Sequence, residues 1–482
     1  MPRAMESSSL KHIFTLPARA SVWVVLCMIV VLAFSAVSAT ASTGATEPLN
    51  PTTGLPGSKT TVAGSGFAAL EIVNITFDSA LLAHPKTKAD GTFSAKITVP
   101  ATAQPGSHTV TSTGKTSKLS ASQTFTVNTD WSMFGFDPTH AGFNPYENTL
   151  NASNVSTLTE AWMEDTGIWG NPCWTPVVVD GVIYGGGQAW STADGTPLWS
   201  DAMPVYCSHP AVVNGVVYVG AYDNNVYALN AADGSIKWKT PTGDYIASSP
   251  AVVKNVVYVG SHDGNVYAFS ALTGKRKWKT SVGAAIRFSS PAVAGGVVYI
   301  GSQNGNLYAL NAATGKAIWT GSGLASYDTS PVVVDGIVYS ETGNGALYAV
   351  NVTDGSVKWS QPGIDGNAIS DCNPVIANGV VYASSVDGSV GPLNAYNATD
   401  GTLIWQSPTN VLPSYLAVAN GVVYGNGAWG FYAFSATDGS VLYHVGDLFG
   451  GAAGNFAVVN GTIYGMWSNG EAYVEAYQLP TP

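Results

Sequence analysis

Residues 248–280, with the sequence SSPAVVKNVVYVGSHDGNVYAFSALTGKRKWKT, decide the fold. The stretch contains four short runs rich in Val, Tyr, Phe and Trp, which favour strands. Turns at Lys254-Asn255, Asp263-Gly264 and Thr273-Gly274 separate the runs, and Gly and Asn provide the positive φ that tight hairpins need. We expect a four-stranded antiparallel unit that is too small to bury its own faces and therefore needs similar neighbours.

The unit recurs along the chain with a period of about 40 residues. Its two markers are a tyrosine that ends the second strand and an aromatic residue in the fourth strand. A period of this length with four strands per repeat predicts a β-propeller, and the alternation of apolar and polar residues excludes an α-solenoid. The markers are Tyr184, Tyr218, Tyr258, Tyr299, Tyr339, Tyr382, Tyr424 and Tyr464, and Trp162, Trp199, Trp238, Trp278, Trp319, Trp359, Trp405 and Tyr443.

The strand order also predicts how the ring closes. Residues 159–163 form a lone fourth strand, whereas the last repeat, residues 456–479, has only three strands. Eight four-stranded blades result if residues 159–163 complete the last blade, which removes the free edges of an open sheet. We therefore predict an all-β chain with an eight-bladed propeller over residues 129–482, and with the fourth-strand aromatics wedged between adjacent blades.

The first 128 residues predict three further segments. Residues 1–41 combine basic residues, the apolar run 22–37 and the small residues Ala39-Thr40-Ala41, which is the pattern of a signal peptide, with an uncleaved anchor as the alternative. Residues 42–54 indicate a Ser/Thr/Pro-rich linker, and the alternating pattern of residues 55–128 indicates a small β-sandwich. The protein is thus expected to be secreted or at the cell surface, and to contact a membrane only if the signal is uncleaved.

The overall charge excludes one class of partner. The net charge is −11 and charged residues make up only 10% of the chain. A protein that binds nucleic acid needs a basic stripe for the phosphates, and the composition does not indicate one. We therefore expect no nucleic-acid partner.

The chain from Asp130 to the C-terminus resembles the quinoprotein, or PQQ-repeat, propeller family. The resemblance rests on residues 131–135 (WSMFG), on Asn154-Val155 followed by Leu158, and on repeat cores such as Thr273-Gly274 followed by Trp278. Residues 55–128 resemble the Ig-like modules of bacterial surface proteins. The first resemblance implies a propeller, and the second implies a module that spaces or displays it.

The channel mouth is the default binding site. In a propeller the first strand of each blade lines the central channel, and the loop before it forms the mouth. Three of the eight loops end in Ser/Thr-Ser-Pro, and the unusual residues on this rim indicate binding, with simple loop variability as the alternative. The candidate ligand-binding residues are Trp174, His209, Arg287, Asp328, Asp371 and Tyr415.

Three cysteines, Cys173, Cys207 and Cys372, lie in the mouth loops, two or three residues before the proline. Cys173 and Cys207 come from adjacent blades of an exported chain, so we predict a disulfide between them, with Cys372 left unpaired. A metal site that also uses His209 is the alternative, but the spacing matches no known metal motif. The Asp-Gly turns resemble fragments of calcium loops, yet no carboxylate follows at ligand spacing, so we predict no metal site.

Three functions follow from the resemblance. The dehydrogenases of the family carry a vicinal Cys-Cys pair, a Trp beneath the quinone, calcium ligands and a catalytic Asp, and no Cys-Cys pair occurs here. We therefore expect no catalytic residue, no cofactor, and a non-catalytic scaffold that binds a protein, a peptide or a cell-wall glycan at the mouth. The alternatives are a dehydrogenase of alcohols or sugars that uses PQQ and calcium, and a sensor that stacks a ligand on Trp174, Tyr415 and Trp429.

Overall fold

The structure is a computed structural model that describes residues 44–169, 175–200, 208–325, 329–343, 345–362, 373–384, 391–410, 415–427, 430–446, 456–468 and 471–480. These residues are mostly strands and turns, with one short 3-10 helix, η1 (Val155–Thr157). No helix among the described residues has the length and apolar character needed to cross a membrane.

Residues 44–128 form a β-sandwich whose two sheets share one hydrophobic core. One sheet has the order β1 (Leu49–Asn50), β3 (Lys59–Gly64) and β6 (Phe93–Thr98). The other has the order β2 (Thr53–Gly54), β8 (Ser120–Val127), β7 (Gly106–Gly114), β4 (Val73–Phe77) and β5 (Ala80–Ala83). Because β1 pairs with β3 and β2 runs parallel to β8, the sandwich includes part of the predicted linker, residues 42–54.

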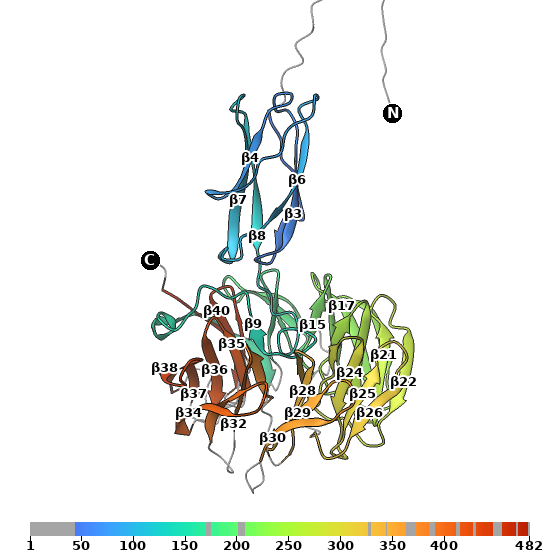
Figure 1. The fold of residues 1–482 in the computed structure, drawn as a ribbon. Coiled ribbons are helices and arrows are strands. Elements are labelled where there is room, and N and C mark those ends of the chain that lie inside the picture. Colours follow the sequence, from blue (N-terminus) through green and yellow to red (C-terminus); the bar gives the residue numbers. More distant parts are fainter. Residues whose placement is uncertain are drawn as a thin grey trace, which may run out of the picture. The chain divides into compact units, whose positions relative to one another are not determined.

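The propeller consists of eight blades in the described residues, each with four antiparallel strands (Figure 1). The inner strands of blades 1 to 8 are β11 (Val177–Val179), β15 (Ala211–Val213), β19 (Ala251–Val253), β23 (Ala292–Ala294), β27 (Val332–Val334), β31 (Val375–Ala377), β35 (Tyr415–Ala419) and β39 (Phe456–Val459). The second strands are β12 (Val182–Gly185), β16 (Val216–Gly220), β20 (Val256–Ser261), β24 (Val297–Gly301), β28 (Ile337–Glu341), β32 (Val380–Ser384), β36 (Val422–Gly427) and β40 (Thr462–Ser468).

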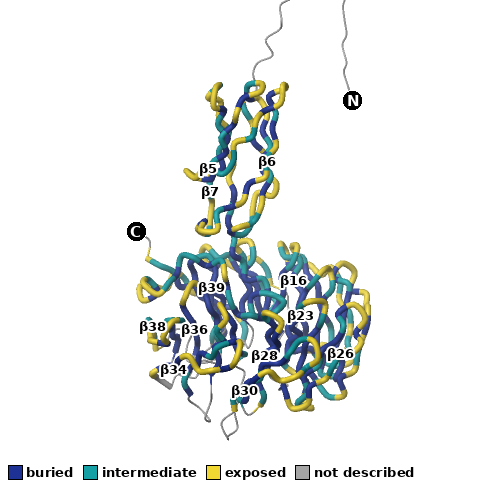
Figure 2. The backbone as a smooth tube through the Cα atoms, in the orientation of Figure 1, coloured by how far each residue is buried: buried dark blue, intermediate teal, exposed yellow. Residues whose placement is uncertain are grey.

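The outer half of each blade follows the same order. The third strands are β13 (Gln188–Ser191), β17 (Asn225–Asn230), β21 (Asn265–Ser270), β25 (Leu307–Asn311), β29 (Leu347–Asn351), β33 (Pro392–Asn397), β37 (Gly430–Ser435) and β41 (Glu471–Gln478). The outer strands are β14 (Pro197–Ser200), β18 (Ile236–Pro241), β22 (Arg276–Ser281), β26 (Ala317–Gly321), β30 (Val357–Gln361), β34 (Leu403–Asn410), β38 (Val441–Val445) and β10 (Thr159–Trp169). Burial is greatest along the inner, second and third strands, and exposure is concentrated in the outer strands and at the turns (Figure 2).

The ring closes as the sequence predicts. Each inner strand contacts the next one, and β39 contacts β11. The last blade has the order β10-β41-β40-β39, so a strand from the start of the propeller completes its end. The pairing places Trp162 opposite Ala476, and β10 extends past the predicted residues 159–163 as far as Trp169.

The fourth-strand aromatics hold adjacent blades together, which confirms their predicted role. The indole of Trp278 donates to the carbonyl of Ala312 in blade 4 at 2.9 Å, and the hydroxyl of Tyr258 donates to the same carbonyl at 3.1 Å. The turn glycine Gly315 lies against the Trp278 ring, where a Cβ atom would come within 2.7 Å of it. The corresponding donors are Trp162, Trp199, Trp238, Trp319, Trp359, Trp405 and Tyr443.

A floor segment, residues 131–144, lies inside the ring and ends in β9 (Phe143–Asn144). The inner strands leave one edge without a partner strand, and its N–H groups need acceptors. Carbonyl groups of the floor segment accept from Val178, Val212, Val293, Val333, Ile376 and Val418, and the Asn144 side chain donates to Val458 O. The floor segment therefore satisfies inner strands from blades 1, 2 and 4 to 8 and closes the channel below the mouth.

Candidate functional site

The mouth loops, which connect the outer strand of one blade to the inner strand of the next, end in a belt of hydrogen bonds. The N–H of the residue before the proline donates to the side chain at the same position in the following blade. The pairs are His209 N to Ser249 Oγ (3.0 Å), Ser249 N to Ser290 Oγ (2.9 Å), Ser290 N to Ser330 Oγ (2.9 Å) and Ser330 N to Asn373 Oδ1 (2.5 Å). This belt joins blades 2 to 6 at the mouth.

The residue two positions before the proline forms a hydrogen bond within its own blade. Its hydroxyl oxygen accepts the N–H of the last residue of the VVYxG run in the second strand. The pairs are Gly220 N to Ser208 Oγ (2.9 Å), Gly260 N to Ser248 Oγ (3.1 Å) and Gly301 N to Ser289 Oγ (3.0 Å). The fold therefore explains the repeated Ser/Thr-Ser-Pro sequence, because both hydroxyls hold the inner strands in place.

Three of the candidate ligand-binding residues lie in the described chain. His209 is buried at the belt position and stacks on Phe134 of the floor segment, with ring centroids 4.8 Å apart. Tyr415 begins β35 and, like Phe134, lines a cavity above the floor segment. Arg287 is exposed, and its guanidinium lies 4.6 Å from the ring centroid of Phe288. The structure thus brings His209 and Tyr415 to the channel centre and leaves Arg287 in solvent.

The other candidates fall outside the described residues. They are Trp174, Asp328 and Asp371, together with the predicted disulfide partners Cys173 and Cys207. Trp429 and Cys372 also fall there. Their roles and the disulfide stay predictions.

The cavity above the floor segment has a volume of about 40 Å³ and includes His140, which the sequence analysis did not single out. Burial lowers the pKa of His140 to about 3, helped by the nearby His209 and opposed by its contact with the Pro331 carbonyl. The ring is therefore neutral, and its Nδ1 carries the proton because it lies 3.2 Å from Pro331 O. Trp131 also lines the cavity, and its buried indole N–H has no hydrogen-bond partner among the described residues.

Glu341 is the second functional candidate that the sequence analysis missed. It ends β28 at the position that holds Gly220, Gly260 and Gly301 in earlier blades. Its carbonyl accepts the hydroxyl of Thr329, one position before the belt, at 2.7 Å. The side chain is buried, and within the described residues its Oε2 has no hydrogen-bond partner. Burial raises its pKa well above the usual range. The departure from glycine in the repeat was the signal that could have found it.

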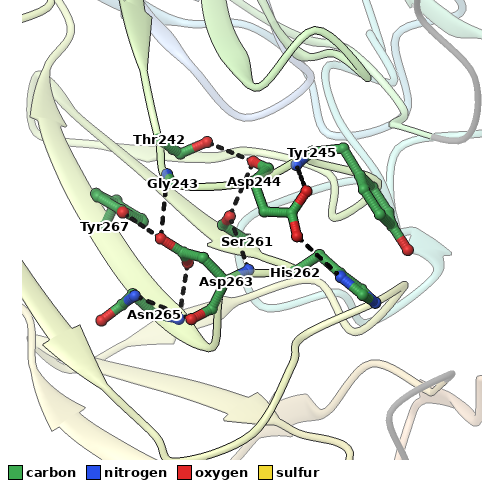
Figure 3. A network of polar contacts seen from close by, with 9 residues as sticks. All are labelled: Thr242, Gly243, Asp244, Tyr245, Ser261, His262, Asp263, Asn265 and Tyr267. Atoms are coloured by element: carbon green, nitrogen blue, oxygen red, sulfur yellow. Dashed lines mark hydrogen bonds and ion pairs between the residues drawn. The ribbon is translucent and has the colours of Figure 1, made fainter.

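Blade 3 carries a polar network with an aromatic face at its mouth loop (Figure 3). The Asp263 carboxylate accepts the N–H of Gly243 at 3.1 Å and the hydroxyl of Tyr267, so it is used within the blade. Asp244 contacts His262 Nδ1 at 3.3 Å, and His262 stacks on Tyr245 with centroids 4.3 Å apart. The stacked rings give a flat surface beside a carboxylate.

Comparison with known proteins identifies the repeat family. The family described as outer membrane protein assembly factor BamB matches residues 174–361 and 285–473, which together cover more than half of the chain. The chain belongs to this PQQ-repeat family. Its all-β propeller fold, predicted from the sequence, is thereby confirmed.

Relatives with a known activity match a shorter part of the chain. Quinohemoprotein alcohol dehydrogenase from Comamonas testosteroni is 32% identical over 131 residues, and the quinone-dependent alcohol dehydrogenase subunit from Komagataeibacter europaeus is 29% identical over 131 residues. Each match covers 23% of this chain and 18% of the relative, so the matched part spans less than a fifth of these relatives.

Solved structures show the same fold at low identity. The crystal structure of the Comamonas testosteroni enzyme superimposes with a TM-score of 0.62 at 17% identity, over 73% of this chain and 82% of the other. BamB from Moraxella catarrhalis superimposes with a TM-score of 0.54 at 18% identity, over 68% of this chain and 99% of the other.

These relatives correct the function preferred from the sequence. The absence of a Cys-Cys pair favoured a non-catalytic scaffold outside the dehydrogenase group. The relatives with significant sequence matches are quinone-dependent alcohol dehydrogenases, so the dehydrogenase alternative is the better supported one. The scaffold interpretation was wrong because it gave the missing Cys-Cys pair more weight than the similarity of part of the chain to these dehydrogenases.

Proposed function

We propose that this protein is a quinone-dependent dehydrogenase that oxidises alcohols at the channel mouth. The observation that carries the proposal is the 32% identity over 131 residues with quinohemoprotein alcohol dehydrogenase. The proposal includes export, which the signal-like N-terminus predicts. Binding of a protein, peptide or glycan partner is a further prediction, and the BamB-like fold is compatible with it.

The activity implies a PQQ-type quinone and a calcium ion, and one feature of the mouth fits the cation. Calcium binds carboxylate oxygens, and Glu341 Oε2 is a buried carboxylate oxygen without a partner among the described residues. The described residues contain no group of three or more His, Cys, Asp or Glu able to hold a metal ion. We therefore propose that Glu341 contributes one carboxylate ligand to the cation.

In this proposal Glu341, the mouth loops and the floor segment each have a different role. A PQQ-type quinone, when bound, would supply the acceptor for the two electrons and two protons that the alcohol loses. Glu341 is neutral when buried alone, and a nearby cation keeps it ionised. The floor cavity of about 40 Å³ holds about one water, so the mouth loops, rather than the floor, have to bind the quinone. His140 and Phe134 seal the site from below.

The test adds PQQ and Ca²⁺ to the purified full-length chain. We expect stoichiometric quinone uptake in the absorbance spectrum and reduction of an artificial dye with primary alcohols. The Glu341→Gln variant keeps the shape but loses the negative charge, so we expect the Ca²⁺ concentration needed for quinone uptake to rise about tenfold or more.

The matched control is Glu47→Gln, which changes a buried carboxyl in the sandwich core. It should bind quinone and reduce dye as the unchanged chain does. Failure of the unchanged chain to take up PQQ at any Ca²⁺ concentration would overturn the proposed activity. Equal Ca²⁺ dependence in Glu341→Gln and the unchanged chain would overturn the assigned role of Glu341.

A further inference from the structure

A groove of about 660 Å³ lies between blades 3 and 4, at the hairpins that join inner and second strands. These hairpins lie at the ends of the inner strands away from the mouth loops, so the groove is separate from the candidate site. Its volume falls within the range of small-molecule sites. The lining residues include Val253, Lys254, Val256, Lys277, Val293, Ala294 and Ala313.

The two hairpins that border the groove differ from the other inner hairpins. Both central residues of these turns have positive φ, which favours Asn, Asp and Gly. Among the eight inner hairpins that the structure describes, six begin with Asn or Asp, at Asp180, Asn214, Asp335, Asn378, Asn420 and Asn460. Blade 3 instead has Lys254 at φ 47°, and blade 4 has the pair Gly295-Gly296.

The turn of blade 3 thus carries a side chain that its backbone conformation does not favour. A lysine in the left-handed region costs about 1 kcal/mol relative to residues that favour it. Lys254 adopts this conformation despite the cost, and its exposed side chain lines the groove. Gly295 and Gly296 remove side chains from the opposite wall, since a Cβ built at either one meets nothing within 4 Å.

Blades 3 and 4, which border the groove, carry a charge opposite to that of the whole chain, and Lys254 and Lys277 line the groove itself. Residues 248–323 contain seven cations and a single acid, Asp263, in a chain of net charge −11. That acid is used in the blade 3 network at the mouth side. The cations are Lys254, Lys275, Arg276, Lys277, Lys279, Arg287 and Lys316. A local excess of positive charge on an acidic protein attracts anions.

The walls of the groove are apolar, and two of the residues in them are small. Ala294 stands where blade 3 has Val253, and Ala313 stands where blade 3 has Leu272. Val253, Val256 and Val293 supply the remaining apolar surface. An apolar body can therefore lie between the blades while a charged group reaches the lysines.

We propose that this groove binds a small organic anion with an apolar body, held by Lys254 and Lys277. The ammonium groups bind the carboxylate or sulfonate, and the apolar walls bury the rest of the molecule. Neither lysine takes part in the proposed dehydrogenase site, so binding here does not depend on quinone.

The experiment measures the fluorescence of anilinonaphthalene sulfonate on titration with the folded full-length chain. Octanoate should displace the dye, and octanol, which has the same chain length without the charge, should need about tenfold more. The double variant Lys254→Gln/Lys277→Gln should bind the dye about tenfold or more weakly. The matched control Lys358→Gln, which changes the same strand position in blade 5, should bind it as the unchanged chain does.

A second variant tests the apolar walls while keeping the charges. Ala294→Val/Ala313→Leu introduces the residues that blade 3 carries at these positions, so the fold should tolerate them, and dye binding should fall by about tenfold or more. Equal displacement by octanol and octanoate would overturn the proposal. So would unchanged dye binding in either double variant when circular dichroism shows a folded chain.

Discussion

Glu47 is a buried carboxyl in the sandwich core, and it makes the stability of this module depend on pH. It is 1% exposed, and burial raises its pKa to about 7, with Ser112 opposing the rise only in part. The unfolded chain releases this proton near pH 4.5, so stability is lost as the pH rises from about 4.5 to 7. We expect Glu47→Gln to stabilise the sandwich at pH 8 by about 1–2 kcal/mol, as measured by calorimetry.

Glu71 provides a control of opposite sign. Burial acts to raise the pKa of Glu71, but hydrogen bonds outweigh this effect and lower the pKa to about 2. The donors are Ser117, Ala68 and Thr116. The contribution of Glu71 to the free energy of unfolding is present above pH 4.5 and is lost as the pH falls toward 2. Glu71→Gln should therefore destabilise the sandwich most at neutral pH. A stabilising effect of Glu47→Gln that is the same at pH 4 and pH 8 would contradict the assignment.

At the residue scale the sequence could predict the residues that pack the blades better than the residues of the candidate site. The wedge role of Trp278 followed from a repeated aromatic residue, because every blade needs the same contact with its neighbour. Glu341 could not be recognised among the mouth-loop residues, because it ends a second strand and lies outside those loops. His140 carries no repeat signal, since the floor segment occurs once in the chain.

At the scale of elements the floor segment determines how the channel ends. Gly142 has φ 65°, and a Cβ atom there would lie 2.6 Å from Val375 in β31. Its carbonyl accepts the N–H of Val418 at 2.9 Å. We expect Gly142→Ala to displace the segment and lower stability by about 2–3 kcal/mol, from strain and crowding together. Hydrogen exchange at Val418 and Ile376 should become faster.

Gly323 is the matched control, because it has φ 71° but nothing lies within 4 Å of a Cβ atom there. Gly323→Ala should show only the backbone strain, about 1 kcal/mol. If both substitutions cost the same and leave exchange at Val418 unchanged, the floor segment does not carry the closure assigned to it.

The regular strands could be predicted from the sequence, and the floor segment could not. Alternation and turn residues mark each blade strand, and the lone fourth strand at residues 159–163 was correctly assigned to the last blade. The floor segment has no period, since each of its carbonyl groups meets a different inner strand. Residues 131–135 therefore supported the family resemblance, but the sequence predicted no pairing of this segment with the inner strands.

At the scale of the whole molecule, ring closure depends on β41, which pairs with both β10 and β40. Ala476 lies opposite Trp162 on one side and Tyr464 on the other. Proline at this position lacks an N–H and does not fit a central strand, so we expect Ala476→Pro to lower stability by about 3 kcal/mol or more. Calorimetry should show a lower melting temperature, and limited proteolysis should cut near β10.

Ala476→Gly is the control, because glycine keeps the N–H and costs only about 1 kcal/mol in a strand. Protease resistance of β10 in the glycine variant and its loss in the proline variant would support closure through β41. Equal resistance in both variants would show that the ring holds without this pairing.

The donated strand has a consequence for biosynthesis. β10 ends at Trp169 and its partner β41 begins at Glu471, so β10 leaves the ribosome about 300 residues ahead of its partner. At roughly 5–20 residues per second, this eleven-residue strand waits on the order of 15–60 s with its backbone groups unpaired. An exposed strand edge promotes aggregation, so the nascent chain has most need of a chaperone during this interval.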